Sequence, residues 1–139
     1  MSTNNQELVS TFLAFIDSAR NDLSSRAPDS ISYIHIKTLD IIERLGQPSM
    51  SDLAEGLNIA SPGITVIVDK LVESKEIKRL DDPNDRRVTR LTITPKGKND
   101  LKKGMEEMRT RIAKKFEILD QAEKTVLRAL LEKLTNIKK

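Results

Sequence analysis

The chain of 139 residues has no cysteine and no tryptophan, a single histidine, and only 3% aromatic residues. The lack of cysteine excludes disulfide bonds, thiolate metal sites and a peroxide sensor based on cysteine. One imidazole with carboxylates alone is a poor ligand set for zinc, so we expect no metal site. The hydrophobic core is therefore expected to be aliphatic.

Membrane spans and catalytic motifs are also missing from the sequence. No apolar run approaches the roughly 18 residues of a membrane-spanning helix, and the stretch from Met1 to Glu7 is polar without a signal-peptide pattern. We therefore expect a cytoplasmic protein that does not bind membranes. The sequence has no glycine-rich phosphate loop, and His35 has no recognisable catalytic partner. We expect no enzymatic activity and no cofactor.

The formal net charge is only +3, but the charge is unevenly distributed. Residues 1–60 hold 4 Lys or Arg and 8 Asp or Glu, whereas residues 61–139 hold 20 and 13, so the two parts carry −4 and +7. A positive segment favours binding to phosphates. For the terminal Lys138 and Lys139, solubility is an equally good explanation.

A short helix is predicted over residues 49–57. It begins with Ser49 as N-cap and has Asp52 three residues later, which is the pattern of a capping box. Asn58 follows where a left-handed helix end is expected. The inward positions of this helix are Met50, Leu53, Ala54 and Leu57.

A second helix, predicted over residues 61–74, has a slim and polar outer face. It is expected to open with Ser61 as N-cap and Pro62 in its first turn. The apolar residues of its inner face recur at helical spacing: Ile64, Ile67, Val68 and Leu71. A slim helix can enter the major groove of DNA, where Val66 can meet a thymine methyl group. The two helices predict a helix-turn-helix whose recognition helix contacts DNA through Ser61, Gly63, Thr65, Val66 and Lys70.

A basic hairpin follows, predicted over residues 77–93. Its return strand, residues 88–93, alternates so that one face packs on a core while Arg90 points outward. A turn at Asp82 would carry two arginines beyond the body of the domain. The alternative is an ordinary solvated hairpin with local pairing of Asp and Arg.

A hairpin of this kind can serve as a wing that probes DNA. The wing residues expected to contact DNA are Asp85, Arg86, Arg87 and Arg90. Arg86 or else Arg87 would enter a narrow minor groove, while Asp85 would hold its neighbouring arginine extended.

A helix-turn-helix followed by a basic wing resembles the MarR family of transcription regulators. The matching strings are Ser51-Asp52-Leu53-Ala54, Thr65 to Leu71, Asp82-Pro83-x-Asp85-Arg86-Arg87, and Leu91-Thr92-Ile93-Thr94-Pro95-Lys96-Gly97. The resemblance spans the whole chain and implies a fold that is mainly α with a small β-wing. Val66 departs from the polar or basic residue of many members, which bears on the operator that is read. Lys75 departs from the usual glycine at the end of the recognition helix.

Helical patterns flank the winged helix-turn-helix, which is predicted over residues 30–98. A helix from Ser30 to Leu45 is expected to bury Ile34, Leu39, Ile41, Ile42 and Leu45. A long connecting helix is predicted over residues 95–118.

Residues 1–28 and 110–139 are predicted to form dimerisation helices, with a break in the chain at residues 26–29. The apolar stripes of the first and last helices are Leu8, Phe12, Phe15, Ile16, Ala19 and Leu23, and Val126, Leu127, Leu130, Leu131, Leu134 and Ile137. A monomer would expose many of these side chains. We therefore expect a homodimer whose first and last helices interlock, as the resemblance also implies.

These features together predict a sequence-specific regulator of transcription that binds double-stranded DNA. Recognition helices about one turn of B-DNA apart, roughly 34–36 Å, would read a palindromic operator. We expect a repressor that a small-molecule signal releases from its promoter, although activation by displacing another repressor would look identical in sequence. In the family, small aromatic or lipophilic acids commonly act as effectors. The residues expected to line an effector cleft, or else to serve as plain core, are Phe12, Phe15, Ile16, Tyr33 and His35.

Two alternatives use the same fold. In the first, the winged helix of an adaptor docks a partner protein; in the second, an architectural protein binds duplex DNA without sequence preference. Salt dependence separates the adaptor from a DNA binder, because neutralising phosphates makes affinity fall steeply with salt. An architectural protein would show no preferred palindrome.

Overall fold

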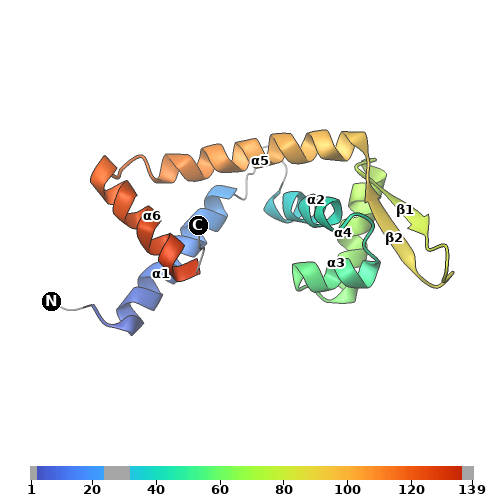
Figure 1. Cartoon of the computed structure of the whole chain (residues 1–139), viewed down its shortest axis with the longest axis horizontal. Coiled ribbons are helices and arrows are strands. Elements are labelled where there is room, and N and C mark those ends of the chain that lie inside the picture. The colour runs from blue at the N-terminus through green and yellow to red at the C-terminus, as the bar shows by residue number, and fades with distance from the viewer. Residues whose placement is uncertain (1–2, 24–31, 136–139) are drawn as a thin grey trace. The chain divides into compact units, whose positions relative to one another are not determined.

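The computed structural model describes residues 3–23 and 32–135, which form two compact units. Residues 23–108 make up the winged unit, and residues 1–22 with 109–139 make up the terminal unit. Helix α5, Pro95–Lys115, contributes to both (Figure 1). The predicted fold class, mainly α with a small β-wing, is confirmed.

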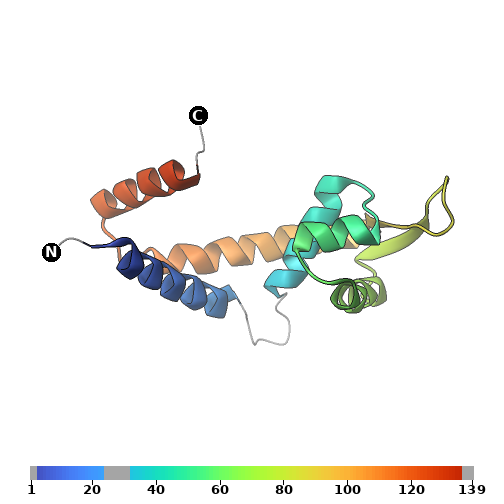
Figure 2. The ribbon, with the colours of Figure 1, turned by 90° about the horizontal axis from the view of Figure 1, so that it is seen from below.

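The winged unit consists of three short helices, a two-stranded sheet and the first part of α5 (Figure 1). In chain order these are α2 (Tyr33–Leu45), α3 (Met50–Leu57), α4 (Ser61–Glu73), β1 (Ile77–Asp81) and β2 (Thr89–Ile93). Figure 2 shows the hairpin of β1 and β2 projecting beyond α3 and α4. The predicted start of the first of these helices at Ser30 lies outside the described residues.

Local capping explains where α3 begins and ends. The Ser49 side chain accepts from the backbone N–H of Asp52 at 3.0 Å, and the Asp52 carboxylate accepts from the Ser49 N–H at 3.1 Å, so the predicted capping box is confirmed. Asn58 adopts the left-handed conformation at φ 54° and ends the helix, also as predicted.

The ends of α4 differ in one respect from the prediction. Its N-cap is Ala60, without a side-chain hydrogen bond, and Ser61 is already the first helical residue. The predicted N-cap at Ser61 is therefore wrong by one residue, because Pro62 fits either of the first two helical positions. The helix ends at Glu73, and Lys75 takes the positive φ of 65° at the position where a glycine was noted as missing.

The core of the winged unit is aliphatic. Its buried hydrophobic side chains are Ile36, Leu39, Ile41, Ile42, Leu53, Leu57, Ile64, Val68, Leu71, Ile77, Leu91 and Leu101. Two predicted core residues of α2 are wrong, since Ile34 and Leu45 are 36% and 55% exposed. Both follow the helical period but lie in the terminal turns of α2. Ile36 and Thr38 are buried instead.

The two strands pair antiparallel, with Ile77 opposite Ile93 and Asp81 opposite Thr89. The return strand begins at Thr89, one residue later than predicted, and Leu91 faces the core as its alternation requires. The backbone of Arg90 also pairs with that of Ser49, and the Leu91 N–H donates to the Pro48 carbonyl oxygen at 2.9 Å. The first half of β2 is therefore joined to the loop before α3.

The terminal unit contains α1 (Asn5–Leu23), the end of α5 and α6 (Gln121–Thr135). The predicted connecting helix is three residues too long, because the helix ends at Lys115 and residues 116–118 form a turn. The predicted break at residues 26–29 and the apolar position at Ile137 lie outside the described residues. No described helix is long and apolar enough to cross a membrane.

Candidate nucleic-acid interface

The outer face of α4 is open to solvent. Ser61, Thr65, Val66 and Lys70 are exposed, and Val66 is 56% accessible despite being apolar. Gly63 is half-buried, and a Cβ at this position would lie 2.9 Å from Cγ2 of Ile59, so this turn accommodates only a minimal side chain without adjustment. All five residues predicted to contact DNA from this helix therefore lie on its first three turns, where a slim surface is available.

The hydroxyl hydrogen of Thr65 is already engaged in a hydrogen bond within α4. Its Oγ1 donates to the carbonyl oxygen of Ser61 at 3.3 Å. The lone pairs of the hydroxyl remain free to accept from an amino group on a base edge.

Asp69, on the same exposed part of α4, forms an ion pair with a residue of β1. The Arg79 guanidinium on β1 donates to the Asp69 carboxylate, and both side chains are substantially exposed. This pair could not be predicted from the sequence, because the partners lie ten residues apart on different elements. Arg79 offsets the negative charge that Asp69 would otherwise present to DNA.

The tip of the wing is shaped by two aspartates. Asp82 Oδ1 accepts from the backbone N–H groups of Asn84 and Asp85, at 2.8 and 3.0 Å. Asp85 accepts from Arg87 through Oδ1 and Oδ2, at 3.1 Å from Nε and 3.1 Å from Nη2. Arg87 is therefore held by the neighbouring carboxylate, whereas Arg86 is exposed and forms no ion pair with any residue that the structure describes.

Arg90 does not point outward as predicted. Its side chain is 35% exposed, and its Nε lies 2.8 Å from Oδ2 of Asp82. Nη1 lies 3.2 Å from the Gln47 carbonyl oxygen and 3.7 Å from Oδ2 of Asp52. Strand alternation placed the residue on the correct side of the sheet, but the loop before α3 covers that side.

Hydrogen bonds hold three carboxylates of this region in the charged form. The side-chain hydrogen bond from Arg90 is the largest cause that lowers the pKa of Asp82, followed by the backbone hydrogen bond from Asn84. Arg87 likewise lowers the pKa of Asp85, first through its side chain. The pKa of Asp52 is lowered by the hydrogen bonds from Ser49 and by the charge of Arg90.

The residues predicted to line an effector cleft belong to different units. Phe12, Phe15 and Ile16 lie on α1, and Tyr33 and His35 lie on α2. Phe15 contacts Phe116 with ring centroids 6.4 Å apart. Within neither unit does the structure assemble the complete predicted set.

His35 has a partner that sequence analysis missed. Its Nε2 lies 2.9 Å from both carboxylate oxygens of Glu76, which is only 3% exposed. Ser74 Oγ also donates to the Glu76 carboxylate. The partners are 41 residues apart, so no local pattern could reveal the pair. Among the residues that the structure describes, no group of three or more His, Cys, Asp or Glu is arranged to hold a metal ion.

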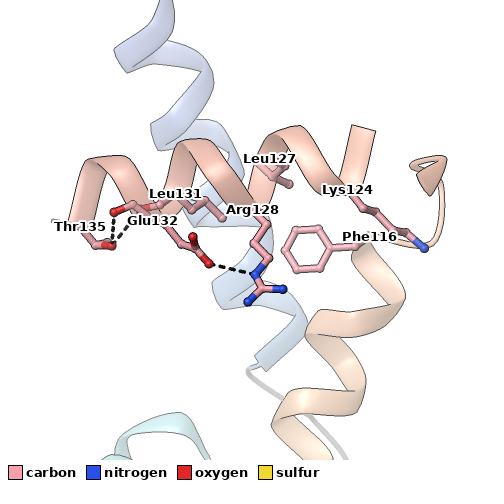
Figure 3. Close-up of a pocket in the computed structure, with 7 residues that line it drawn as sticks. All are labelled: Phe116, Lys124, Leu127, Arg128, Leu131, Glu132 and Thr135. Atoms are coloured by element: carbon pink, nitrogen blue, oxygen red, sulfur yellow. Dashed lines mark hydrogen bonds and ion pairs between the residues drawn. The ribbon is translucent and has the colours of Figure 1, made fainter. Parts of the chain in front are cut away.

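A second surface lies on the terminal unit. Apolar side chains of α1 and α6 are largely exposed: Leu8, Val9, Phe12, Leu13, Phe15, Val126, Leu130, Leu131 and Leu134. None of the residues of α6 is buried. A groove of about 440 Å³ runs along α6, lined by Phe116, Lys124, Leu127, Arg128, Leu131, Glu132 and Thr135. Figure 3 shows the ring of Phe116 beside Arg128 and below Leu127 on this side of α6.

An exposed helix face, a supporting helix and a projecting basic hairpin define a winged helix-turn-helix protein, a class of DNA-binding protein. The model of the MarR family matches residues 31–89 of the chain. The winged unit therefore matches the MarR family, whose members are regulators of transcription and not enzymes. The resemblance to the MarR family, inferred from the sequence strings of the wing and the helices, is confirmed.

The comparisons extend beyond the winged unit. YpoP of Bacillus subtilis (strain 168), an uncharacterised HTH-type transcriptional regulator, is 29% identical over 115 residues, which cover 83% of this chain and 82% of YpoP. A mutant MarR from E. coli in complex with operator DNA superposes with a TM-score of 0.72 at 21% identity, covering 91% of this chain and 92% of that one. BpsR of Bordetella bronchiseptica, whose DNA binding is regulated by 6-hydroxynicotinic acid, superposes with a TM-score of 0.71 at 21% identity, covering 93% and 99%.

Proposed function

We propose that this regulator binds a palindromic operator as a homodimer and represses transcription from the promoter it occupies. The carrying observation is the joint exposure of the outer face of α4 and of Arg86 at the wing tip on one compact unit. A helix in the major groove and an arginine in the neighbouring minor groove would read one half-site together. Such a protein acts in the cytoplasm, where the DNA is.

The recognition helix would supply sequence preference. Val66 offers an apolar contact for a thymine methyl group, and Thr65 accepts from base amino groups. Lys70 is exposed in the last turn of α4 and would meet phosphate. This arrangement favours an operator half-site that contains thymine at the step facing Val66.

Dimerisation is supported by the exposed apolar side chains of α1 and α6. Helix α6 has five large apolar residues and none of its residues is buried, and exposed apolar surface of this kind marks an interaction site. The groove beside Phe116 offers a place for the partner's side chains. A two-fold axis would then set two recognition helices roughly 34–36 Å apart, as one turn of B-DNA requires.

Release by a small molecule is the remaining part of the proposal. An effector must bind two arrangements of the dimer with different affinity, because equal binding shifts no equilibrium. BpsR provides an example of regulation by a small aromatic acid. For this chain we propose an aromatic or lipophilic acid as the effector, with Phe12, Phe15, Ile16, Tyr33 and His35 as residues to test.

Selection of bound sequences from a random duplex pool tests the proposal. An enriched inverted repeat, retested by titration at two salt concentrations, would support a dimeric and sequence-specific regulator. Binding with steep salt dependence and no enriched sequence would instead indicate an architectural protein. Absence of binding at low salt would favour an adaptor that docks a protein partner.

A further inference from the structure

Arg90 lies on β2 opposite Leu80, one residue pair from the loop of the wing, and its side chain joins two segments of the winged unit. It donates from Nε to Asp82 at 2.8 Å and from Nη1 to the Gln47 carbonyl oxygen at 3.2 Å. We propose that Arg90 is a positioning residue, which holds the wing in the orientation that DNA binding needs and does not itself contact DNA. The inference rests on the proposed DNA binding and assigns Arg90 a different role from Arg86.

On the wing side, Arg90 fixes the residue that shapes the tip. Asp82 uses Oδ2 for Arg90 and Oδ1 for the backbone N–H groups of Asn84 and Asp85. The side chain of Asp82 is 10% exposed, so its carboxylate is largely withdrawn from water. Removing the guanidinium would leave this carboxylate without its charged partner and would loosen the turn that presents Arg86.

On the helix side, Arg90 reaches the start of α3. Gln47 supplies a carbonyl oxygen, and Asp52, which closes the capping box, has its Oδ2 at 3.7 Å from Nη1. The backbone of Arg90 pairs with Ser49 in the same place. Since α3 packs against α4 through the shared core, the wing and the recognition helix are held in one relation to each other.

A direct phosphate contact by Arg90 is the competing role. It would require the guanidinium to leave Asp82, and the gain from the phosphate would be offset by the loss of this charge-assisted hydrogen bond. Arg86 carries no such restriction, because it is exposed and unpaired within the described residues. The two arginines should therefore differ in how their loss affects the dependence of affinity on salt.

The test measures both DNA affinity and order of the wing in the full-length protein. Arg90→Gln and Asp82→Asn each break the Arg90–Asp82 bond, and Asp82→Asn keeps an Oδ1 acceptor for the turn. Affinity for the selected duplex should fall about tenfold in each, the cost of ordering about one extra residue on binding. The slope of log affinity against log salt should stay unchanged. Amide hydrogen exchange of residues 82–88 in the free protein should become faster.

Asp81→Asn is the matched control for charge. Asp81 is exposed on the neighbouring position and lies outside the contacts of Arg90, so its loss removes the same charge and leaves the link intact. It should leave exchange at the tip unchanged and should not weaken DNA binding. The double variant with Arg90→Gln and Asp82→Asn should lose no more affinity than either single variant, since both break one interaction.

Three results would overturn the proposal. The first is that Arg90→Gln lowers the salt slope by about one unit while Asp82→Asn tightens binding, as expected of a direct phosphate contact. The second is faster exchange at the tip without loss of affinity. The third is unchanged exchange in both variants, which can be observed even if the wild-type protein binds no duplex. If the wild-type protein binds no duplex, the proposed function is refuted. The hydrogen-exchange result then decides whether Arg90 orders the wing.

Discussion

Replacing Gly97 with alanine should destabilise the winged unit, although alanine is the better helix former. Gly97 lies in the first turn of α5, where a Cβ would be 2.1 Å from the Glu76 carbonyl oxygen and 2.7 Å from Cγ1 of Ile93. Carbon and oxygen atoms without a bond ordinarily approach to about 3.3 Å. The start of α5 would therefore have to move by about 1 Å away from a backbone group.

The size of the effect follows from the contacts that this movement disturbs. Thr94 Oγ1 accepts from the Gly97 N–H at 3.0 Å, and the Thr94 N–H donates to the Glu76 carbonyl oxygen at 3.0 Å. Loss of these two bonds costs about 1 kcal/mol each. Overpacking adds about 1–3 kcal/mol, and the helix propensity of alanine returns about 1 kcal/mol. The free energy of unfolding should fall by about 2–4 kcal/mol.

Urea denaturation followed by far-UV circular dichroism, at equal protein concentration, measures this change. Gly56→Ala is the matched control, because it brings the same gain in helix propensity within α3. Its Cβ would lie 3.2 Å from Cγ2 of Ile41, a side-chain atom that can shift, so we expect stability within about 1 kcal/mol of the wild type. Equal stability of Gly97→Ala and Gly56→Ala would refute the reasoning.

Four further predictions concern DNA binding, assembly and pH. Arg86→Ala should weaken operator binding and lower the salt slope by about one unit or less per subunit, with unchanged helical content by circular dichroism; an unchanged slope would remove it from the interface. Thr65→Ala should reduce the preference for operator over random DNA in competition titrations, and equal losses on both would assign Thr65 to backbone contact. Leu130→Asp, which puts a charge on the exposed stripe of α6, should give monomers or unfolded chain in sedimentation analysis, and a stable dimer would contradict the proposed seam. Because the folded-state pKa of Asp82 is lowered from 3.8, its contribution to wing order is present above that pH and lost as the pH falls through the folded pKa. Tip exchange should show this acid step, and Asp82→Asn should reduce it to the part that Asp85, whose pKa is also lowered, contributes.

Features set by neighbouring residues could be predicted from the sequence. The capping box of Ser49 and the left-handed Asn58 depend on contacts within four residues, so their sequence pattern is sufficient. The helical periods of α3 and α4 predicted their core faces for the same reason. These local signals, together with the charged turn of the wing, were enough for the fold.

Partners far apart in the sequence could not be predicted. Arg90 is separated by 43 residues from Gln47, and the partial covering of its side chain depends on the loop before α3, which the sequence around Arg90 does not reveal. The same holds for Glu76, whose burial and pairing with His35 arise only when α2 meets the turn after α4. The ends of α2 show a related limit of prediction. Ile34 lies at an apolar position of the helical period, but the core does not extend as far as the first turn of the helix.

The formal charges of residues 81–90, around the tip of the wing, cancel, which bears on how the tip would attract DNA. Residues 81–90 contain three aspartates and three arginines, and two of the arginines are bound by aspartates. Asp82 and Asp85 weaken the attraction to phosphate, but each also fixes an arginine that would otherwise lose up to about 2 kcal/mol of side-chain entropy on binding. The ordering of the paired arginines and the attraction of the unpaired Arg86 to phosphate therefore contribute separately to DNA affinity. We expect the salt slope to reflect Arg86 and Lys70 more than the total number of basic residues, because only unpaired cations release a full counterion from DNA.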